Sequence, residues 1–289
     1  MGNNEYIDVN YTIKKTMIKN TLNLFILIAT FSASLNMQAQ NSVSYVNTKT
    51  NDFSNFKGNN RNSKKAKPEA AEKVNYDLWE VLLKKNVSAT GTVNYEGFRK
   101  DSDKFNDFLR QLSRVKITTT WTKTEKMAYW INVYNAYTIK LIVNNFPVAS
   151  IKEIDGPWKK KFFTVDGKVM SLGEIEHQIL RGFGDPRIHF AINCASASCP
   201  RLIQVPYRAS NLERLLERQT KEFINDPFYN TITNYSVNVS KLFDWYKKDF
   251  KEDSGSVVNF INKYSDVNIG PQKNKGYKTY DWSINALRN

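Results

Sequence analysis

The sequence predicts an α+β fold: a single domain with several helices around a central buried helix and a small, mostly antiparallel sheet. Helical and extended patterns alternate along the chain after residue 73. Residues 124–146, TEKMAYWINVYNAYTIKLIVNNF, have apolar side chains on nearly every side of the expected helix, which is typical of a buried helix. The β-rich pieces are short and surround the turn residues Asp166-Gly167 and Asn234, so the sheet should be small.

The first half of the domain should be mainly helical. Apolar residues three and four positions apart predict amphipathic helices over residues 76–87 and 103–115. The segment VNYEGFRKD, residues 93–101, is expected to be short and extended. The central helix begins with a threonine cap followed by Glu125, and Pro147 lies just beyond its end.

The second half should mix hairpins with helices. We expect a hairpin over residues 161–171, around the turn Asp166-Gly167, and a strand over residues 188–194 that is followed by small polar residues. Two capping patterns, Ser171 with Glu174 and Ser210 with Glu213, predict helices through Arg181 and Ile224. The remaining expected elements are a hairpin over 228–239, helices over 240–250 and 255–264, and an aromatic tail over 277–285 that packs on the core.

Residues 1–39 have the features of a secretory signal peptide: lysines, a short apolar run at 22–31 and small residues before a cleavage site. The apolar run is too short to cross a bilayer comfortably, although an uncleaved anchor is the alternative. Met17 would be a better start, so residues 1–16 are interpreted as an over-extended start or a dispensable one. Residues 40–73 are polar and predict a flexible linker, which leaves 74–289 as the globular domain.

The formal net charge is +14, which favours anionic partners such as envelope polymers, lipid headgroups or acidic glycans. The alternative is a basic but merely solvated surface. An exported protein is expected in the periplasm or outside the cell, where nucleic acid is a less probable partner and disulfides can form. We expect no stable membrane span after signal cleavage.

Residues 185–201, DPRIHFAINCASASCPR, are the most informative for function, because they contain both cysteines and one of the two histidines of the chain. In a regular strand, alternate side chains point to opposite faces. The polar face would carry four candidate residues: Asp185, Arg187, His189 and Asn193. Cys194 would lie on the apolar face, so a dyad with His189 requires a turn at 193–194.

The two cysteines could be in any of three chemical states. Cys194 could be a nucleophile, with the small residues 195–198 offering backbone amides to an anion or oxyanion. Cys194 and Cys199 could instead form a disulfide, the usual expectation in an exported protein, or both could be inert thiols. A zinc site built from two cysteines and two histidines is disfavoured, because the chain lacks a C-x2-C knuckle.

Other polar residues have both a structural and a functional interpretation. His177 could belong to a surface ion-pair cluster or act as a general base beside Glu176. Asn132 and Asn135 lie on one face of the central helix and could tie it to loop backbone or orient a catalytic imidazole. Walker, dinucleotide-binding, serine-elbow and zincin motifs are missing from the sequence, so no cofactor or metal is expected.

Five segments, YWINVYNAYTIKLI, SLGEIEHQILR, DPRIHFAINCASASCPRL, LFDWYKKDF and YDWSIN, together resemble the family called domain of unknown function 547. The resemblance runs from about Val74 to the C-terminus and implies an exported bacterial member without the coiled-coil region of plant members. It implies no reaction, but it marks important positions: Asn132, Asn135, Glu176, His177, Asp185, Arg187, His189, Cys194, Cys199, Pro200, Asp281 and Trp282.

Two functional hypotheses follow. In the first, an exported thiol-dependent hydrolase or acyltransferase acts on envelope amides or esters. Cys194 is its nucleophile and His177 or His189 its base, Asn135 or Glu176 orients the base, and Arg187 holds an anionic group. Asp185, Asn132 and Asn193 complete the expected substrate site. In the second, the protein is a binding module for an anionic glycan or peptide, with a Cys194–Cys199 disulfide.

Overall fold

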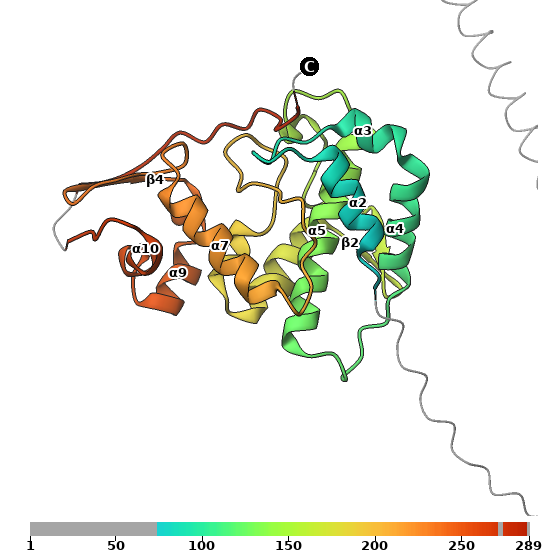
Figure 1. Cartoon of the computed structure of the whole chain (residues 1–289), viewed down its shortest axis with the longest axis horizontal. Coiled ribbons are helices and arrows are strands. Elements are labelled where there is room, and N and C mark those ends of the chain that lie inside the picture. The colour runs from blue at the N-terminus through green and yellow to red at the C-terminus, as the bar shows by residue number, and fades with distance from the viewer. Residues whose placement is uncertain (1–73, 271–273, 288–289) are drawn as a thin grey trace, which may run out of the picture. The chain divides into compact units, whose positions relative to one another are not determined.

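The computed structural model describes residues 74–270 and 274–287. The predicted signal peptide and linker, residues 1–39 and 40–73, lie outside the described residues. Within the described part, helices and short strands are mixed, so the α+β prediction is confirmed (Figure 1). In the same part of the chain, no helix has both the length and the hydropathy needed to cross a membrane.

Three helices, α2 (Asp77–Asn86), α3 (Tyr95–Lys100) and α4 (Ser102–Arg114), gather beside α5 at one end of the described part (Figure 1). The helix α3 corrects the prediction of an extended piece. The Asn94 side chain accepts the Gly97 amide at 2.8 Å and so starts a helical turn. Glycine is needed there, because a Cβ atom on Gly97 would lie 2.0 Å from Oδ1 of Asn86.

The central helix is α5 (Lys123–Asn145), which is buried on nearly all sides as predicted. Its capping box is formed by Thr122 with Glu125, so the cap lies two residues before the expected start. Phe105 and Phe108 of α4 and Trp79 of α2 stack beside it in the first hydrophobic core.

Both predicted hairpins are confirmed. The first joins β1 (Phe163–Val165) to β2 (Lys168–Met170), and the second joins β3 (Thr231–Ile232) to β4 (Ser236–Val239). β4 also pairs in parallel with β5 (Asn274–Tyr277), so the second sheet is mixed.

The remaining helical elements lie after α5 in the chain. They are η1 (Ile151–Glu153), α6 (Leu172–Glu174), the π-helical η2 (Ile175–Leu180), η3 (Arg181–Phe183), η4 (Pro186–Phe190), α7 (Leu212–Asn225), α8 (Leu242–Trp245), α9 (Lys247–Ser254) and α10 (Val257–Tyr264). The capping box of Ser171 and Glu174 is confirmed. That of Ser210 and Glu213 is wrong, because the N-cap of α7 is Asn211 and Glu213 instead pairs with Arg187.

A second hydrophobic core lies under α7, α9, α10 and β4, at the other end of the described part in Figure 1. Phe190 of η4 enters this core and packs against Phe223, Phe243 and Phe260. His189, the residue before Phe190 in the chain, belongs to the candidate site described below. Residues 185–201 are therefore anchored between α5 on one side and the second hydrophobic core on the other.

Candidate active site

A cavity of about 190 Å³ lies where α5, η2, η4, α8 and the C-terminal tail meet. Four of its lining residues were predicted to be functional: Glu176, His177, His189 and Cys194. The other lining residues are Tyr134, Trp158, Ile192, Cys199, Leu242, Trp245, Tyr246, Tyr280 and Trp282. The cavity thus collects thiol, imidazole, carboxylate and phenol groups from segments that are far apart in the sequence.

The predicted strand over residues 188–194 is wrong. Residues 186–190 form the 3-10 helix η4 instead, because Asp185 caps it by accepting the Arg187 amide and Pro186 stands at its first position. The alternation that would place His189 and Cys194 on opposite faces therefore does not apply. Both side chains line the same cavity.

The chain turns directly around Cys194. The Asn193 side chain accepts the Ala195 amide at 2.9 Å, and Ala195 has a left-handed φ of 62°. Such a φ is uncommon for a residue other than glycine and is often found at functional sites. Asn135 fixes the same turn from α5, since it donates to the Ala191 carbonyl at 2.9 Å and accepts the Asn193 amide at 2.8 Å.

Three of the four amides of residues 195–198 are already engaged, which limits the expected anion-binding loop, and the Ser196 amide hydrogen-bonds to Cys194. The Ala195 amide donates to Asn193, and the amides of Ala197 and Ser198 donate to the carbonyls of Ser283 and Asp281 in the tail. These bonds tie residues 195–198 to the C-terminal tail. They leave no donor on these three amides for a substrate oxyanion.

Both cysteines are free thiols in the structure, and the proposed disulfide is not formed in it. The Cys194 amide donates to Sγ of Cys199 at 2.8 Å. Hydrogen bonding by the Cys199 side chain lowers the pKa of Cys194, and contacts with Ser196 and Tyr280 lower it further against the effect of burial. Burial and the neighbouring Cys194 raise the pKa of Cys199. The pair therefore consists of one thiol prone to ionise and one that stays protonated.

Two hydroxyl groups surround the Cys194 sulfur. Oγ of Ser196 lies 3.2 Å from it and the phenol oxygen of Tyr280 lies 3.3 Å from it. Ser196 also donates to Tyr280 at 3.0 Å, which leaves the Tyr280 proton available to the sulfur. Burial and the nearby Cys194 charge raise the pKa of Tyr280, so it keeps that proton.

His189 is almost completely buried and forms a pair with Asp249 of α9. Nε2 of His189 lies 2.8 Å from Oδ2 of Asp249, and the imidazole stacks on Tyr246 with ring centroids 3.7 Å apart. Burial alone would raise the pKa of Asp249, but hydrogen bonds from Arg181 and His189 outweigh this and lower it. Asp249 is thus ionised, so we assign the proton of the neutral imidazole to Nε2. Nδ1 is buried without a partner among the described residues and keeps a free lone pair.

Stability is expected to fall as the pH decreases from about 7.5 to about 5.5. Burial lowers the pKa of His189 from 6.5, against the opposing effect of Asp249. Unfolding restores the ordinary pKa, so the unfolded state binds more protons just below pH 6.5 and is favoured there. The contribution of Asp249 is lost only below its ordinary pKa of 3.8, outside this window. Urea unfolding at the two pH values measures the decrease, which should be smaller for His189→Gln. An equal decrease in both proteins would contradict this account.

Glu176 of η2 is buried and accepts hydrogen bonds from two phenols, Tyr134 of α5 and Tyr246. Burial raises the pKa of both tyrosines, and the Glu176 charge raises it further. Glu176 does not hydrogen-bond to His189 in the described part of the chain. Its charge nevertheless acts on the imidazole and opposes the lowering of the His189 pKa by burial. Tyr246, which Glu176 holds, stacks on the same ring. The predicted role of Glu176 in orienting the base therefore has no hydrogen bond to His189 behind it.

His177 lies at the cavity with a half-exposed side chain. Its Nδ1 atom is 3.9 Å from Oε1 of Glu176, too far for a hydrogen bond. Of the two predicted bases, only His189 has a hydrogen bond, to Asp249, that can fix the tautomer of its ring; the Glu176 contact of His177 is too long to do so.

The two asparagines of α5 have the structural role. Asn132 donates to the carbonyls of Ala128 and Tyr207 and accepts the Tyr207 amide at 3.2 Å. Asn135 holds the turn before Cys194 and does not contact an imidazole. Asn193 donates to the Pro200 carbonyl at 2.8 Å. None of the three lines the cavity, so their predicted roles in orienting the base or binding substrate are not supported by this geometry.

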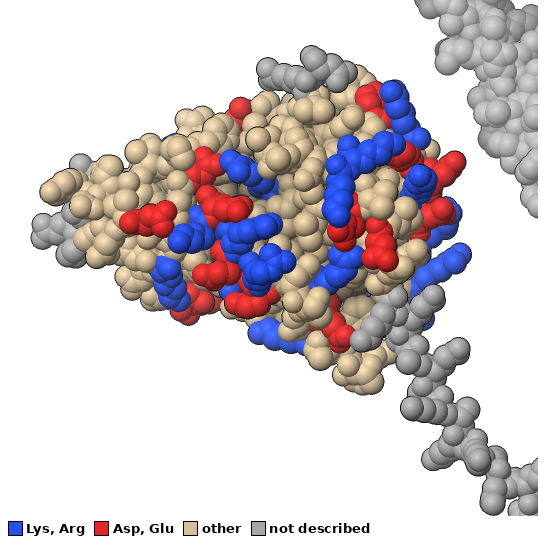
Figure 2. All heavy atoms as spheres, in the orientation of Figure 1, with Lys and Arg blue, Asp and Glu red and all other residues tan. Residues whose placement is uncertain are grey.

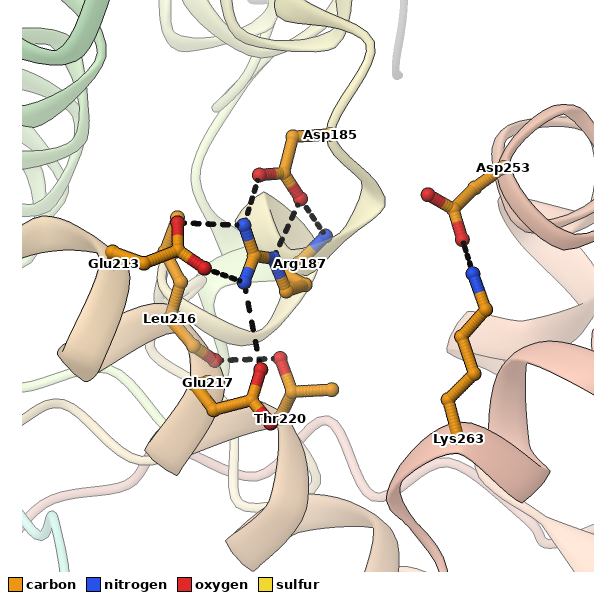
Figure 3. Close-up of polar contacts among 8 residues, drawn as sticks. All are labelled: Asp185, Arg187, Glu213, Leu216, Glu217, Thr220, Asp253 and Lys263. Carbon is orange, nitrogen blue, oxygen red and sulfur yellow. Dashed lines mark hydrogen bonds and ion pairs between the residues drawn. The ribbon is translucent and has the colours of Figure 1, made fainter.

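Arg187 also lies away from the cavity. Figure 3 shows its guanidinium among Asp185, Glu213 and Glu217, with the closest contact 2.6 Å to Glu213. Asp185 binds it through both carboxylate oxygens and, with Glu213, raises its pKa. Three carboxylates already compensate its charge, so the predicted binding of an anionic substrate group by Arg187 or Asp185 is not supported. Instead, this cluster fastens η4 to α7.

Several residues of the site were missed by the sequence reasoning: Asp249, Ser196, Tyr280, Tyr246, Trp245 and Trp158. A signal existed for most of them. Asp249, Tyr246 and Trp245 belong to the motif LFDWYKKDF, and Tyr280 belongs to YDWSIN. Sequence reasoning misses them because their neighbours in space are distant in the chain: His189 and Asp249 are 60 positions apart, and Cys194 and Tyr280 are 86 positions apart.

On the face drawn in Figure 2, Lys and Arg side chains are interspersed with Asp and Glu rather than gathered in one continuous basic patch. Within the described ranges, no cluster of three or more His, Cys, Asp or Glu residues could hold a metal ion.

Comparison with known families extends these observations. Residues 118–224 match the family model described as "Protein of unknown function, DUF547". This range includes α5, η2, η4 and both cysteines, whereas Asp249, Tyr280 and Trp282 lie beyond it. Curated proteins and solved structures give no match. Residues 118–224 are therefore similar to the DUF547 family, the family that the motifs of the chain resemble.

Proposed function

We propose that the cavity is the active site of a thiol-dependent hydrolase or acyltransferase, with Cys194 as the nucleophile. The observation that carries this proposal is the Cys194 thiol itself. It lines the cavity with a partly exposed side chain, and its neighbours lower its pKa against the effect of desolvation. A thiolate is the reactive form of cysteine, and cysteines in such surroundings are the ones that react.

The proposed reaction uses the groups around the cavity as follows. The Cys194 sulfur attacks the carbonyl carbon of an ester or amide, a C–S bond forms, and the bond to the alcohol or amine breaks. Nδ1 of His189 takes the thiol proton and passes it to the leaving group. The same nitrogen then deprotonates water or an acceptor, which breaks the C–S bond and restores the thiol. Asp249 is a positioning residue that holds the imidazole, and Tyr280 is the hydroxyl donor nearest the reacting sulfur.

The cellular setting of this proposal comes from the sequence. The signal-like residues 1–39 suggest export to the periplasm or beyond, and the basic composition suggests an anionic envelope polymer as the carrier of the acyl group. Residues 74–289 would be the exported domain. These parts of the proposal depend on the N-terminal sequence and the net charge.

Reaction with iodoacetamide and with p-nitrophenyl acetate tests the proposal. Cys194 is expected to alkylate at least about tenfold faster than Cys199 near pH 7, because it has the larger thiolate fraction. The ester should leave an acyl group on Cys194, detected by mass spectrometry of the intact protein and its peptides. Cys199→Ser is the matched control and should still be acylated. Acylation of Cys194→Ser to the same extent, or equal alkylation of both thiols, would refute the nucleophile assignment.

The alternative of a binding module with a Cys194–Cys199 disulfide has one observation in its favour: the Cys199 sulfur contacts the Cys194 amide at 2.8 Å, so the two residues are adjacent. The number of free thiols in the native purified protein separates the two proposals. Two free thiols agree with the enzyme. No free thiols before reduction and two after it would favour the binding module.

A further inference from the structure

The walls of the cavity are unusually aromatic. Tyr280 and Trp282 lie 4.6 Å apart, Trp245 lies 4.8 Å from Tyr280 and 5.6 Å from Trp282, and Trp158 meets Trp282 edge-on at 5.8 Å. These distances join ring centroids. We call these four residues the aromatic wall. Trp245 is nearly half exposed, so the wall reaches the surface of the protein.

The wall is held by backbone contacts around the cavity. The Gly173 amide donates to the Trp158 carbonyl at 2.8 Å, and a Cβ atom on Gly173 would lie 2.8 Å from that oxygen. Glycine at the start of α6 therefore permits this close approach. Isolated bridges pair Ser283 with Ser150 and Ile284 with Ser196, which fix the residues that follow Trp282. The rings are thus presented by backbone that is anchored on both sides.

The charge facing the cavity is negative. Glu176 is the carboxylate of the lining, and the lining contains neither Lys nor Arg among the described residues. Both oxygens of Glu176 accept hydrogen bonds from phenols, those of Tyr134 and Tyr246. Among the described residues, no Lys or Arg forms an ion pair with Glu176, although the charge of Arg181 interacts with it at longer range. A buried carboxylate without a close cation is costly, and a cationic ligand would reduce that cost.

Aromatic faces attract cations through the negative potential of the ring. Trp282 already makes one such contact, with the Lys152 ammonium 4.1 Å from its ring centroid. A buried unpartnered nitrogen, Nδ1 of His189, also belongs to a residue of the lining and could accept a hydrogen bond from a ligand N–H or O–H. Rings, a carboxylate and a free acceptor are together the groups that recognise an organic ammonium ion.

We infer that the cavity binds a ligand with a positively charged amine, which places the amine against the aromatic wall and Glu176. The inference deepens the proposed function, because it assigns the substrate class as an amine-bearing ester or amide. It does not conflict with an anionic polymer on the surface, since envelope polymers can carry both carboxylates and free amines. A neutral sugar, which tryptophan can also bind by stacking, is the competing occupant.

Binding of choline and of its uncharged analogue 3,3-dimethyl-1-butanol to the full-length protein tests the inference. Titration calorimetry, with tryptophan fluorescence as a second readout, is expected to show at least about tenfold tighter binding of choline. Glu176→Gln should remove most of this preference. Trp245→Leu changes a partly exposed ring, so it should fold normally and weaken choline binding. Phe228→Ala, at an exposed residue outside the cavity, is the control and should bind as the parent does.

The outcomes separate this inference from the proposed chemistry. Cys194→Ser is expected to keep the preference for choline, so a failure of the nucleophile assignment would leave the binding result unchanged. Equal affinity for the two compounds would overturn the inference. Tighter binding of glucose than of choline would also overturn it, in favour of a neutral sugar. Loss of preference in Phe228→Ala as well as in Trp245→Leu would place the choline site elsewhere and likewise overturn it.

Discussion

Replacement of Phe190 by alanine is expected to lower the free energy of unfolding by about 3–5 kcal/mol, the usual cost of removing a buried phenylalanine ring. Phe190 is fully buried, and its ring centroid lies 5.0 Å from Phe223 and about 6 Å from Phe243, Phe250 and Phe260. Rings from α7, α8, α9 and α10 surround it, so little rearrangement could fill the resulting space. Urea unfolding followed by circular dichroism measures the loss.

Phe228→Ala is the matched control for this change. Its side chain is 59% exposed, so the same replacement should change stability by less than about 0.5 kcal/mol. Phe190→Leu should recover most of the loss because it refills the space. Because His189 precedes Phe190, the alanine variant should also alkylate Cys194 less selectively. Equal losses in the Phe190 and Phe228 alanine variants would show that the second core does not anchor η4.

Asp249→Asn is expected to cost about 2–3 kcal/mol of stability, less than a fully buried pair because both partners keep some exposure. Asp249 receives a forked contact from Arg181, at 2.7 and 2.6 Å, and also meets His189 at 2.8 Å. The side chains of Arg181 and Asp249 are 30% and 15% exposed. Asparagine keeps the shape but leaves the guanidinium without its counter-charge. Urea unfolding near neutral pH measures the effect.

A second readout distinguishes positioning of the imidazole from simple stabilisation. Asp249 opposes the effect of burial on His189, so Asp249→Asn should lower the pKa of that imidazole further. Titration of the His189 ring signals by NMR would detect this shift. Glu252→Gln on the same helix is the control, because Glu252 is 66% exposed and pairs only with Lys248 at 3.6 Å. An unchanged His189 titration in Asp249→Asn would refute the positioning role.

The fold was predictable to the extent that its signals are local. Spacing of apolar residues gave α2, α4, α5 and α10, and turn residues gave both hairpins, since these patterns depend on neighbours in the chain. The extended prediction for residues 93–101 failed because a side-chain cap at Asn94 starts α3. The strand prediction for residues 188–194 failed because alternation of polar and apolar residues over seven positions also fits a 3-10 turn followed by a loop.

The candidate site, too, was predictable only where its signals are local in the chain. Sequence alone identified residues 185–201, with both cysteines and His189, as the chemical segment, and His177 as a second candidate base upstream of it. It could not pair His189 with Asp249 or Cys194 with Tyr280, which are 60 and 86 positions apart. It also assigned Arg187 to a ligand, although α7 supplies carboxylates that compensate its charge.

By itself, then, the sequence determined the α+β class, the central buried helix, the resemblance to the DUF547 family and the segment that holds both thiols and one imidazole. Only the tertiary structure decided that His189 and Cys194 line one cavity and that Asp249 holds the imidazole. It also decided that rings and a carboxylate face the cavity while Arg187 does not. The physical reason is that local patterns determine the secondary structure of a segment and which of its faces is buried. Shifts in pKa, ion pairs and cavities arise instead from groups that the fold brings together from distant parts of the chain.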